Sequence, residues 1–286
     1  MDGGMDLALL RQWRQILSRA ELECHVPEIA LARILAPTHV DLLGKSQSTS
    51  DAMSYARFRP ITNRYLNDAY VWANVLRQLG FVGRNVTEIA PGRSLTIALA
   101  LALLEFDGEL VLIDSVKWPS QSWESLRYRY SVLFHQVDIF SRPDLVEDAN
   151  LLAMNHAIDD LFIGLWAAEN NMDYFGPAMD SVEISNAAWA NAMANPRKHL
   201  SRLTDLASRL CGALPLGALV VIRNYPSRFE TYYEQVDRVN FVAELTARLV
   251  KVFEARGFQS VGVDLGRVAG HAGSKFPGSF WALLRR

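Results

Sequence analysis

The most informative polar cluster in the chain follows an apolar run, in the stretch "LLAMNHAIDDL". His156 titrates near neutral pH and is a candidate general base, with Asn155 beside it and Asp160 as a second candidate proton acceptor. Asp159 lies three residues after His156, a helical spacing at which it can orient the imidazole or share a metal ion with it. Acids in the first turn of a helix also stabilise the helix dipole, and we expect that ordinary role for at least one of the two. No other set of metal ligands accompanies these residues, so we expect no metal.

Three more acidic side chains stand where strands are expected to end: Glu88, Asp114 and Asp138. The carboxyl ends of parallel strands share one edge of a sheet, which is where open α/β sheets bind ligands. The turn that follows Glu88, "EIAPGRS", has Gly92 as its single glycine and contains Pro91, which has no N–H group. A pyrophosphate must approach the backbone closely, and turns that hold one usually carry three glycines. The turn therefore predicts a ligand without phosphate groups.

A long insertion at residues 170–195 carries Tyr174 and Phe175 next to Gly176 and Pro177. An aromatic face attracts a cation such as a sulfonium by about 0.5–2 kcal/mol. Tyr174 is therefore a candidate catalytic residue. The alternative is that the two rings pack the insertion onto the sheet.

Two further segments mix aromatic rings with arginines. The stretch "RNYPSRFETYYE" is expected either to line an acceptor pocket or to form a surface loop. The N-terminal stretch "YARFRPITNRYLNDAY" suits a lid that excludes water, with an arginine fork for a carboxylate. Its alternatives are a helix pair docked on the sheet edge and a homodimer surface. The side chains concerned are Arg223, Tyr225, Tyr232 and Tyr233 in the first stretch, and Tyr55, Arg57, Arg59, Tyr65 and Tyr70 in the second.

The elements that position these residues alternate between strand and helix from residue 82 onward, which predicts a parallel sheet with helices on both faces. The expected strands are residues 86–89, 110–114, 134–139, 151–155, 218–223, 260–264 and 280–284, and the expected helices are 94–106, 122–130, 158–169, 196–210 and 237–256. No helix fits between the last two strands, so they must run antiparallel. We predict an α/β, Rossmann-like, mostly parallel seven-stranded sheet with an antiparallel last strand at residues 81–286, preceded by an N-terminal helical region at residues 1–80.

The composition excludes several classes of protein. The 286 residues are 50% hydrophobic and carry a formal net charge of −2, without the basic run of a nucleic-acid binder. Cys24 and Cys211 form neither a disulfide framework nor a metal-ligand spacing. The acidic opening residues do not resemble a signal peptide, and the longest apolar stretches are too short to span a bilayer. We expect a cytoplasmic protein whose partner is a small molecule, without contact to nucleic acid or membrane.

The core at residues 82–286 resembles the class I S-adenosylmethionine (SAM)-dependent methyltransferase family. The resemblance is carried by the turn after the first strand, by the acids that end the second strand and follow the third, by the cluster after the fourth strand, and by the antiparallel last strand. It implies that Asp114 holds the ribose hydroxyls of SAM and that Asp138, next to an apolar residue, reaches the adenine amino group. The cofactor contacts that it implies are Glu88, Ala90, Gly92, Ser94, Asp114, Ser115, Asp138, Ile139 and Asn155. Ala90 and Pro91 replace glycines that are usual in the family, which changes how the methionine part would lie.

Three functions are compatible with these residues. The first is methyl transfer from SAM to a nitrogen or oxygen of a small molecule, with His156 or Asp160 taking the proton. The absence of the Asn-Pro-Pro-Tyr pattern argues against a nucleic-acid base as the acceptor. The second is cyclisation of SAM itself to azetidine-2-carboxylate with release of methylthioadenosine. The unusual turn, which would place the aminobutyryl chain differently, and Tyr174, which would stabilise the sulfonium, favour this reaction. The third is a non-catalytic binding subunit with the SAM-binding fold that stabilises a partner enzyme, since one fold can serve different functions.

Overall fold

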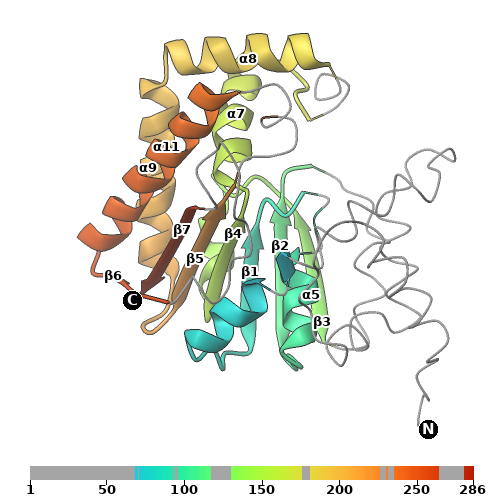
Figure 1. The fold of residues 1–286 in the computed structure, drawn as a ribbon, viewed down its shortest axis with the longest axis vertical. Coiled ribbons are helices and arrows are strands. Elements are labelled where there is room, and N and C mark those ends of the chain that lie inside the picture. The colour runs from blue at the N-terminus through green and yellow to red at the C-terminus, as the bar shows by residue number, and fades with distance from the viewer. Residues whose placement is uncertain are drawn as a thin grey trace, which may run out of the picture.

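The computed structural model describes residues 68–69, 71–92, 94, 96–116, 130–175, 181–225, 230, 235–263 and 280–286. Within them, seven strands form one sheet in the order β3-β2-β1-β4-β5-β7-β6 (Figure 1). The strands are β1 (Asn85–Ile89), β2 (Glu109–Asp114), β3 (Ser131–Gln136), β4 (Leu151–Asn155), β5 (Leu219–Asn224), β6 (Gln259–Ser260) and β7 (Phe280–Arg285). The first five are parallel, and β7 pairs antiparallel with both β5 and β6. The predicted fold class is confirmed.

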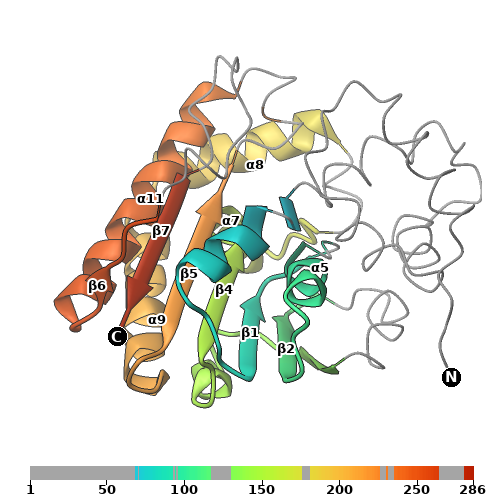
Figure 2. The same ribbon diagram turned by 60° about the horizontal axis from the view of Figure 1, so that its bottom comes forward.

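Helices cover both faces of this sheet (Figures 1 and 2). One face packs against α5 (Thr96–Leu103) and against a helix of residues 68–69 and 71–78, which we call the leading helix. The other face packs against α7 (Ile158–Glu169), α9 (Arg197–Ala213) and α11 (Val236–Ala255). A short 3-10 helix, η1 (Pro143–Val146), contacts α9. In Figure 1, α8 (Val182–Ala194) lies across the end of the molecule toward which the parallel strands point.

Burial explains why the central elements form where they do. All five residues of β4 are buried, as expected for a parallel strand that is covered on both faces. Every residue of α5, "TIALALAL", is buried as well, which is typical of a helix that is apolar all round. The β3 strand lies at the edge of the sheet and is mostly part-exposed. The carboxyl ends of β1 and β4, which carry candidate residues, therefore lie in the buried centre of the sheet.

Most expected elements lie within three residues of the observed ones. The third strand runs from Ser131 to Gln136, three residues earlier than predicted, and the sixth is reduced to Gln259–Ser260. The insertion after the fourth strand contains a helix that the sequence did not predict, α8. The expected helix at residues 122–130 lies almost entirely outside the described residues, as do Cys24, Gly176, Pro177, Tyr232, Tyr233 and the predicted lid residues Tyr55, Arg57, Arg59, Tyr65 and Tyr70.

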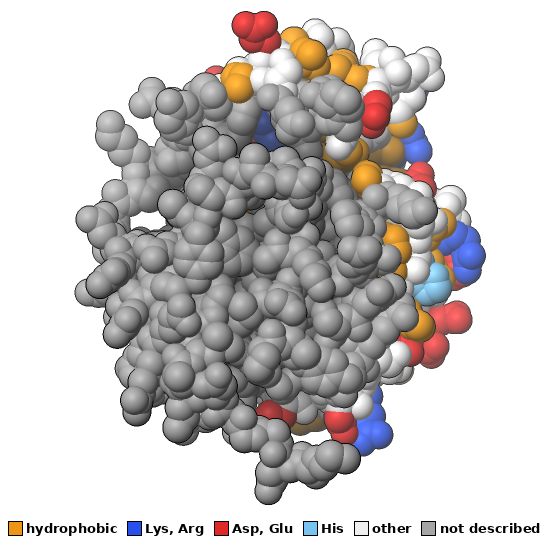
Figure 3. Space-filling model, turned by 90° about the vertical axis from the view of Figure 1, so that its right-hand side faces the viewer, with side chains coloured by type: hydrophobic (Ala, Val, Ile, Leu, Met, Phe, Trp, Pro, Cys, Tyr) orange, Lys and Arg blue, Asp and Glu red, His pale blue; other side chains and the backbone are white. Residues whose placement is uncertain are grey.

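The leading helix belongs to the apolar core of the sheet. Trp72 and Leu76 are completely buried and lie in the same cluster as α5 and the inward side chains of β1, β2 and β4. Residues 1–67 lie outside the described part of the chain, so the predicted domain boundary after residue 80 stays a prediction. On the described part of the face shown in Figure 3, acidic and basic side chains are interspersed.

Candidate functional site

A cavity of about 300 Å³ lies at the carboxyl ends of β1 and β2 and beside the residues that follow β3. One wall is α7 between Asp160 and Ala168, and another is the segment Met172–Phe175. This is the edge at which parallel sheets bind their ligands. Predicted site residues that line it are Ala90, Gly92, Asp114, Ser115, Asp138, Ile139, Asp160 and Tyr174. Among the described residues that line it, four are aspartates, Asp114, Asp138, Asp160 and Asp173, and Arg202 is the single arginine.

The carboxylate of Asp114 is fixed by backbone groups on both sides. Its Oδ2 atom accepts a hydrogen bond from the N–H of Gly92 at 3.1 Å, and its Oδ1 atom accepts one from the N–H of Val116 at 2.9 Å. The side chain is 7% exposed and is a lining residue of the cavity. The last residue of β2 therefore presents an oriented acceptor to any ligand there.

The turn after β1 keeps a left-handed backbone although it has a single glycine. Ala90 has a φ of 50° and Gly92 a φ of 57°. Ala90 donates its N–H to the carbonyl of Ile113, and Ser94 donates its N–H to the carbonyl of Pro91. The Ser94 hydroxyl accepts from the N–H of Thr96 and so caps α5; Ser94 is not among the cavity's lining residues.

Asp138 and Ile139 follow β3 by two and three residues and line the cavity together with Phe140. The Oδ1 atom of Asp138 accepts the N–H of Phe140 at 3.0 Å, which turns the chain back toward the sheet. The guanidinium of Arg202, on α9, lies 5.4 Å from the centre of the Phe140 ring. This end of the cavity thus combines an aromatic ring, an aliphatic side chain and a carboxylate.

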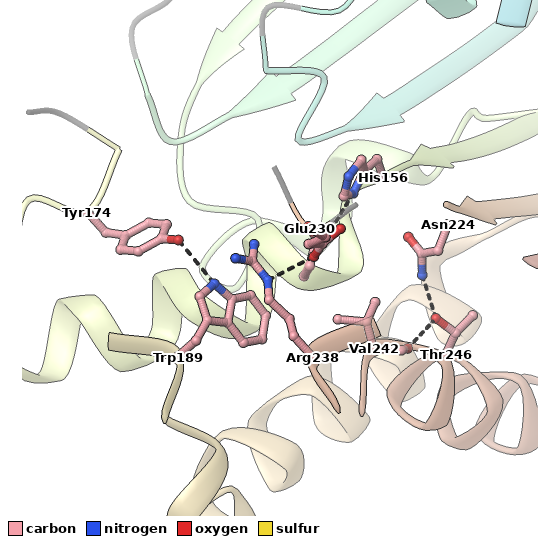
Figure 4. Close-up of polar contacts among 9 residues, drawn as sticks. His156, Tyr174, Trp189, Asn224, Glu230, Arg238, Val242 and Thr246 are labelled. Atoms are coloured by element: carbon pink, nitrogen blue, oxygen red, sulfur yellow. Dashed lines mark hydrogen bonds and ion pairs between the residues drawn. The ribbon is translucent and has the colours of Figure 1, made fainter. Parts of the chain in front are cut away.

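His156 lies behind the cavity, where it is bound to Asp159 as the i, i+3 spacing predicted. Its Nδ1 atom is 2.8 Å from Oδ1 of Asp159 (Figure 4). Burial lowers the pKa of His156, but the charge and hydrogen bond of Asp159, followed by the charges of Asp160 and Glu230, outweigh it and raise that pKa to about 9. The ring of Tyr225 meets the imidazole edge-on at 4.6 Å. His156 is therefore an imidazolium at neutral pH.

The pKa values of the two neighbouring aspartates of α7 are shifted in opposite directions. Burial opposes ionisation of Asp159, but His156 outweighs it and lowers the pKa of Asp159 below its ordinary value. Asp160 lines the cavity, and burial, followed by the charge of Asp159, raises its pKa well above the ordinary value. Of the two predicted proton acceptors, Asp160 is the one that lines the cavity.

Glu88 and Asn155 are buried on the face of the sheet that the leading helix covers. Burial, and then the charge of Asp114, raise the pKa of Glu88 well above its ordinary value. Asn155 accepts a hydrogen bond at Oδ1 from Nε1 of Trp72 at 3.0 Å. The Oε1 atom of Glu88 and the Nδ2 atom of Asn155 have no hydrogen-bond partner among the described residues. Neither residue lines the cavity as the described residues define it.

The hydroxyl of Tyr174 is hydrogen-bonded to residues of α8. The hydroxyl lies 2.9 Å from Oγ of Ser185 and accepts a hydrogen bond from Nε1 of Trp189 at 3.0 Å (Figure 4). On the other side of Trp189, the guanidinium of Arg238 lies 4.1 Å from the centre of its ring and pairs with Glu230. Tyr174 thus ties the cavity wall to α8, while it remains a lining residue of the cavity beside Phe175.

Several residues that shape the site were not predicted. Gly164 lines the cavity, and a β-carbon there would come within 3.3 Å of the Phe175 ring, so the small residue leaves room between α7 and the insertion. Arg202 reaches the cavity from α9, and Trp72 contacts Asn155 from the leading helix. The sequence offered no signal for these three, since each meets its partner only through the tertiary fold. Arg223, predicted for an acceptor pocket, is buried and pairs with Asp68 instead.

Among the described residues, no group of three or more metal-ligating side chains comes together. None of their helices is both long enough and apolar enough to cross a membrane. Cys211 is buried in α9, and burial raises the pKa of its thiol to about 11, which makes it a poor nucleophile.

Comparison with known proteins gives likeness at the level of solved structures alone. No family model and no curated protein matches the chain. An O-methyltransferase family 2 protein from Planctomyces limnophilus, solved with apigenin, is 14% identical, has a TM-score of 0.46, and is matched over 90% of this chain and 69% of that chain. The CurJ carbon methyltransferase is 12% identical, has a TM-score of 0.48, and is matched over 96% of this chain and 70% of its own chain. Human N-acetylserotonin methyltransferase, solved with SAM, is 10% identical, has a TM-score of 0.40, and is matched over 90% of this chain and 69% of its own chain. At these values no shared activity follows, and we infer the function from the chain's own side chains.

Proposed function

We propose that this chain is an enzyme that binds SAM in the cavity and transfers its methyl group to a nitrogen or oxygen atom of a small molecule. The observation that carries the proposal is the charge of the cavity lining, which has four aspartates and one arginine among the described residues. Carboxylates at close range repel phosphate groups and attract a cation. SAM has a sulfonium and an ammonium group and no phosphate, so its charges suit this lining where those of a dinucleotide do not.

Asp114 is the group that we assign to the ribose. A carboxylate offers about four acceptor sites, so Asp114 can accept ribose hydroxyls while it keeps its contacts to the N–H groups of Gly92 and Val116. Ser115, the next residue, lines the cavity too. The resemblance to class I methyltransferases assigns the same role to this acid, and the fixed carboxylate supports that assignment.

The remaining parts of SAM have candidate partners on either side of Asp114. Asp138 and Ile139, with Phe140 beside them, are our candidates for the adenine ring, which needs a hydrogen-bond acceptor and an apolar surface. Glu88 and Asn155 are our candidates for the amino-acid end, because each has a buried polar atom that lacks a partner among the described residues. Buried polar groups are rarely left without one, so a ligand's polar groups there would satisfy both.

The chemistry proposed for the chain is proton removal and positioning. Bound SAM would supply an electrophilic methyl group beside its cationic sulfur. Asp160 accepts the proton of the acceptor's N–H or O–H group, since it lines the cavity and its raised pKa makes it a stronger base than an ordinary aspartate. His156 keeps Asp159 ionised and paired. Tyr174 contributes its ring, for which a nearby sulfonium would gain about 0.5–2 kcal/mol.

The decisive experiment gives the purified chain SAM alone and then SAM with a panel of phenols and amines. Calorimetry measures binding, and mass spectrometry follows the products against a heat-denatured control. We expect SAM to bind and stay unchanged by itself, and S-adenosylhomocysteine to form with an acceptor, more slowly in an Asp160→Asn variant. Methylthioadenosine with a new cyclic amino acid from SAM alone would replace methyl transfer by cyclisation. Absence of SAM binding would overturn the whole proposal.

A further inference from the structure

The turn at His156 needs support from its surroundings. His156 has a φ of 59°, in the left-handed region that side chains other than glycine adopt at a cost. Its N–H group donates to the carbonyl oxygen of Arg223 at 2.7 Å. Asn155 and Arg223 are register partners, the last pair between β4 and β5. The strained turn is therefore attached to this last pair, and whatever fixes the pair also fixes the turn.

The leading helix holds both members of that pair by their side chains. Nε1 of Trp72 donates to Oδ1 of Asn155 at 3.0 Å, and Nη2 of Arg223 donates to Oδ1 of Asp68 at 2.7 Å. Asp68 and Trp72 are four residues apart, a spacing that places two side chains on the same side of a helix. All four residues are buried, at 7% exposure or less. Two directional contacts from one helix thus meet two adjacent strands at the same level.

A second route runs from the leading helix to the imidazole through aromatic rings. The guanidinium of Arg223 lies 4.6 Å from the centre of the Tyr225 ring, and that ring meets the imidazole of His156 at 4.6 Å. Arg223 also lies 5.1 Å from the centre of the Trp281 ring, which in turn packs against Trp72 at 5.1 Å. Displacing Arg223 would therefore displace the ring that packs on His156, in addition to the carbonyl that holds its backbone.

We propose that Asp68 and Trp72 are positioning residues, which act through Arg223 and Asn155 to hold the His156 turn against α7. The inference deepens the proposed function and rests on it, because His156 matters to catalysis through Asp159 and the neighbouring Asp160. Neither Asp68 nor Trp72 lines the cavity formed by the described residues. Their effect on the site is transmitted by contacts, with no direct contact to a ligand in the cavity.

The test measures the imidazole of His156 directly and needs no ligand. Burial lowers the pKa of His156, and Asp159, Asp160 and Glu230 raise it, so this pKa reports on the distance between the imidazole and these three carboxyl groups. In full-length protein with isotope-labelled histidines, an NMR titration follows the ring signals, and a His156→Gln variant assigns them. Trp72→Phe removes one N–H donor and changes no charge, whereas Asp68→Asn removes the negative charge that pairs with Arg223. The matched control is Asp107→Asn, which breaks the exposed ion pair with Arg84.

We expect the pKa of His156 to fall from about 9 toward its ordinary value in Trp72→Phe and in Asp68→Asn, and to stay in place in Asp107→Asn. If Asp68→Asn fails to fold, the charge-neutral Trp72→Phe decides. A folded Trp72→Phe protein with a lower melting temperature and an unchanged His156 titration would overturn the inference, since a merely structural role lowers stability alone. Because no ligand is present, a failure of SAM to bind the unaltered chain would count against the proposed function and leave this result unaffected.

Discussion

Replacing Asp114 by asparagine tests the assignment of the ribose site with the least change in shape. The carboxylate now accepts the N–H groups of Gly92 and Val116, one on each oxygen. An asparagine offers one oxygen and one NH₂ group, so it keeps one of these contacts and turns a donor toward the other N–H. An alanine would leave both N–H groups without an acceptor and would confuse loss of folding with loss of binding.

The expected loss of affinity follows from the contacts that a ribose would make. A hydrogen bond to a charged group contributes about 1.5–3 kcal/mol, so two ribose hydroxyls on Asp114 amount to about 3–6 kcal/mol. Each 1.4 kcal/mol is tenfold in the dissociation constant, which gives a range of roughly 100-fold to 10,000-fold. Because asparagine retains one acceptor oxygen, we expect the Asp114→Asn variant to lie at the lower end, about 100-fold weaker for SAM.

Isothermal titration calorimetry with SAM measures this loss, and the melting temperature of the unliganded variant shows whether it is folded. The control is Asp144→Asn, which breaks an exposed ion pair with Arg142 at the start of η1 and should leave SAM affinity unchanged, since neither residue lines the cavity. A folded Asp114→Asn protein that binds SAM as tightly as the unaltered chain would refute the ribose assignment, because no contact in the cavity would then depend on this charge.

Three further substitutions probe the surroundings of the cavity. Tyr174→Phe should lower the melting temperature by several degrees in calorimetry, because Trp189 loses its hydrogen-bond acceptor at a cost of about 1–3 kcal/mol. SAM affinity should stay unchanged. A loss of affinity at unchanged stability would contradict the structural role of this hydroxyl. The folded protein raises the pKa of Glu88, so ionising Glu88 lowers the stability of the fold as pH rises above 4.5, the ordinary pKa of a glutamate. Glu88→Gln should therefore raise the melting temperature more at pH 8 than at pH 5. Equal increases in melting temperature at the two pH values would contradict the raised pKa. Gly164→Val should place methyl groups against Phe175 and weaken SAM binding at least about tenfold. Gly164→Ala should weaken SAM binding by less. An unchanged SAM affinity in both variants would mean that bound SAM does not contact this wall of the cavity.

The sequence predicted best those elements whose periodicity was uninterrupted. The fourth strand and the helix after it coincide with β4 and α7 residue for residue, because an apolar run is followed there by acids at a helix start. The third strand was placed three residues late, since Val137 and Ile139 continue its apolar pattern beyond Gln136. Ile139 is buried as a lining residue of the cavity, not as part of the sheet. An apolar alternation cannot distinguish these two kinds of burial.

The candidate site was predictable as a set of strand ends and less so as a charge distribution. His156 was expected to act as a base because its ordinary pKa lies near neutrality, but its pKa also depends on Glu230, more than 70 positions away in the chain. Sequence spacing shows the contact with Asp159 and cannot show the one with Glu230. The same limit applies to Arg202 and Gly164, whose roles depend on how α9 and the insertion pack on the cavity.

The turn after β1 shows why a chain can keep the architecture of a nucleotide-binding fold and lose its glycines. A pyrophosphate requires N–H groups that point at it from the turn and the following helix. Here the N–H of Ala90 is donated to β2, that of Gly92 to the Asp114 carboxylate, and that of Thr96 to the Ser94 hydroxyl, while Pro91 has none. Each described N–H group of this turn is thus bound within the protein, and the one at Gly92 orients an anion of the protein itself. A phosphate-binding turn presents free N–H groups and attracts negative charge. In this turn the carboxylate of Asp114 accepts the N–H of Gly92, so the same place attracts positive charge. This arrangement favours a sulfonium ligand over a dinucleotide.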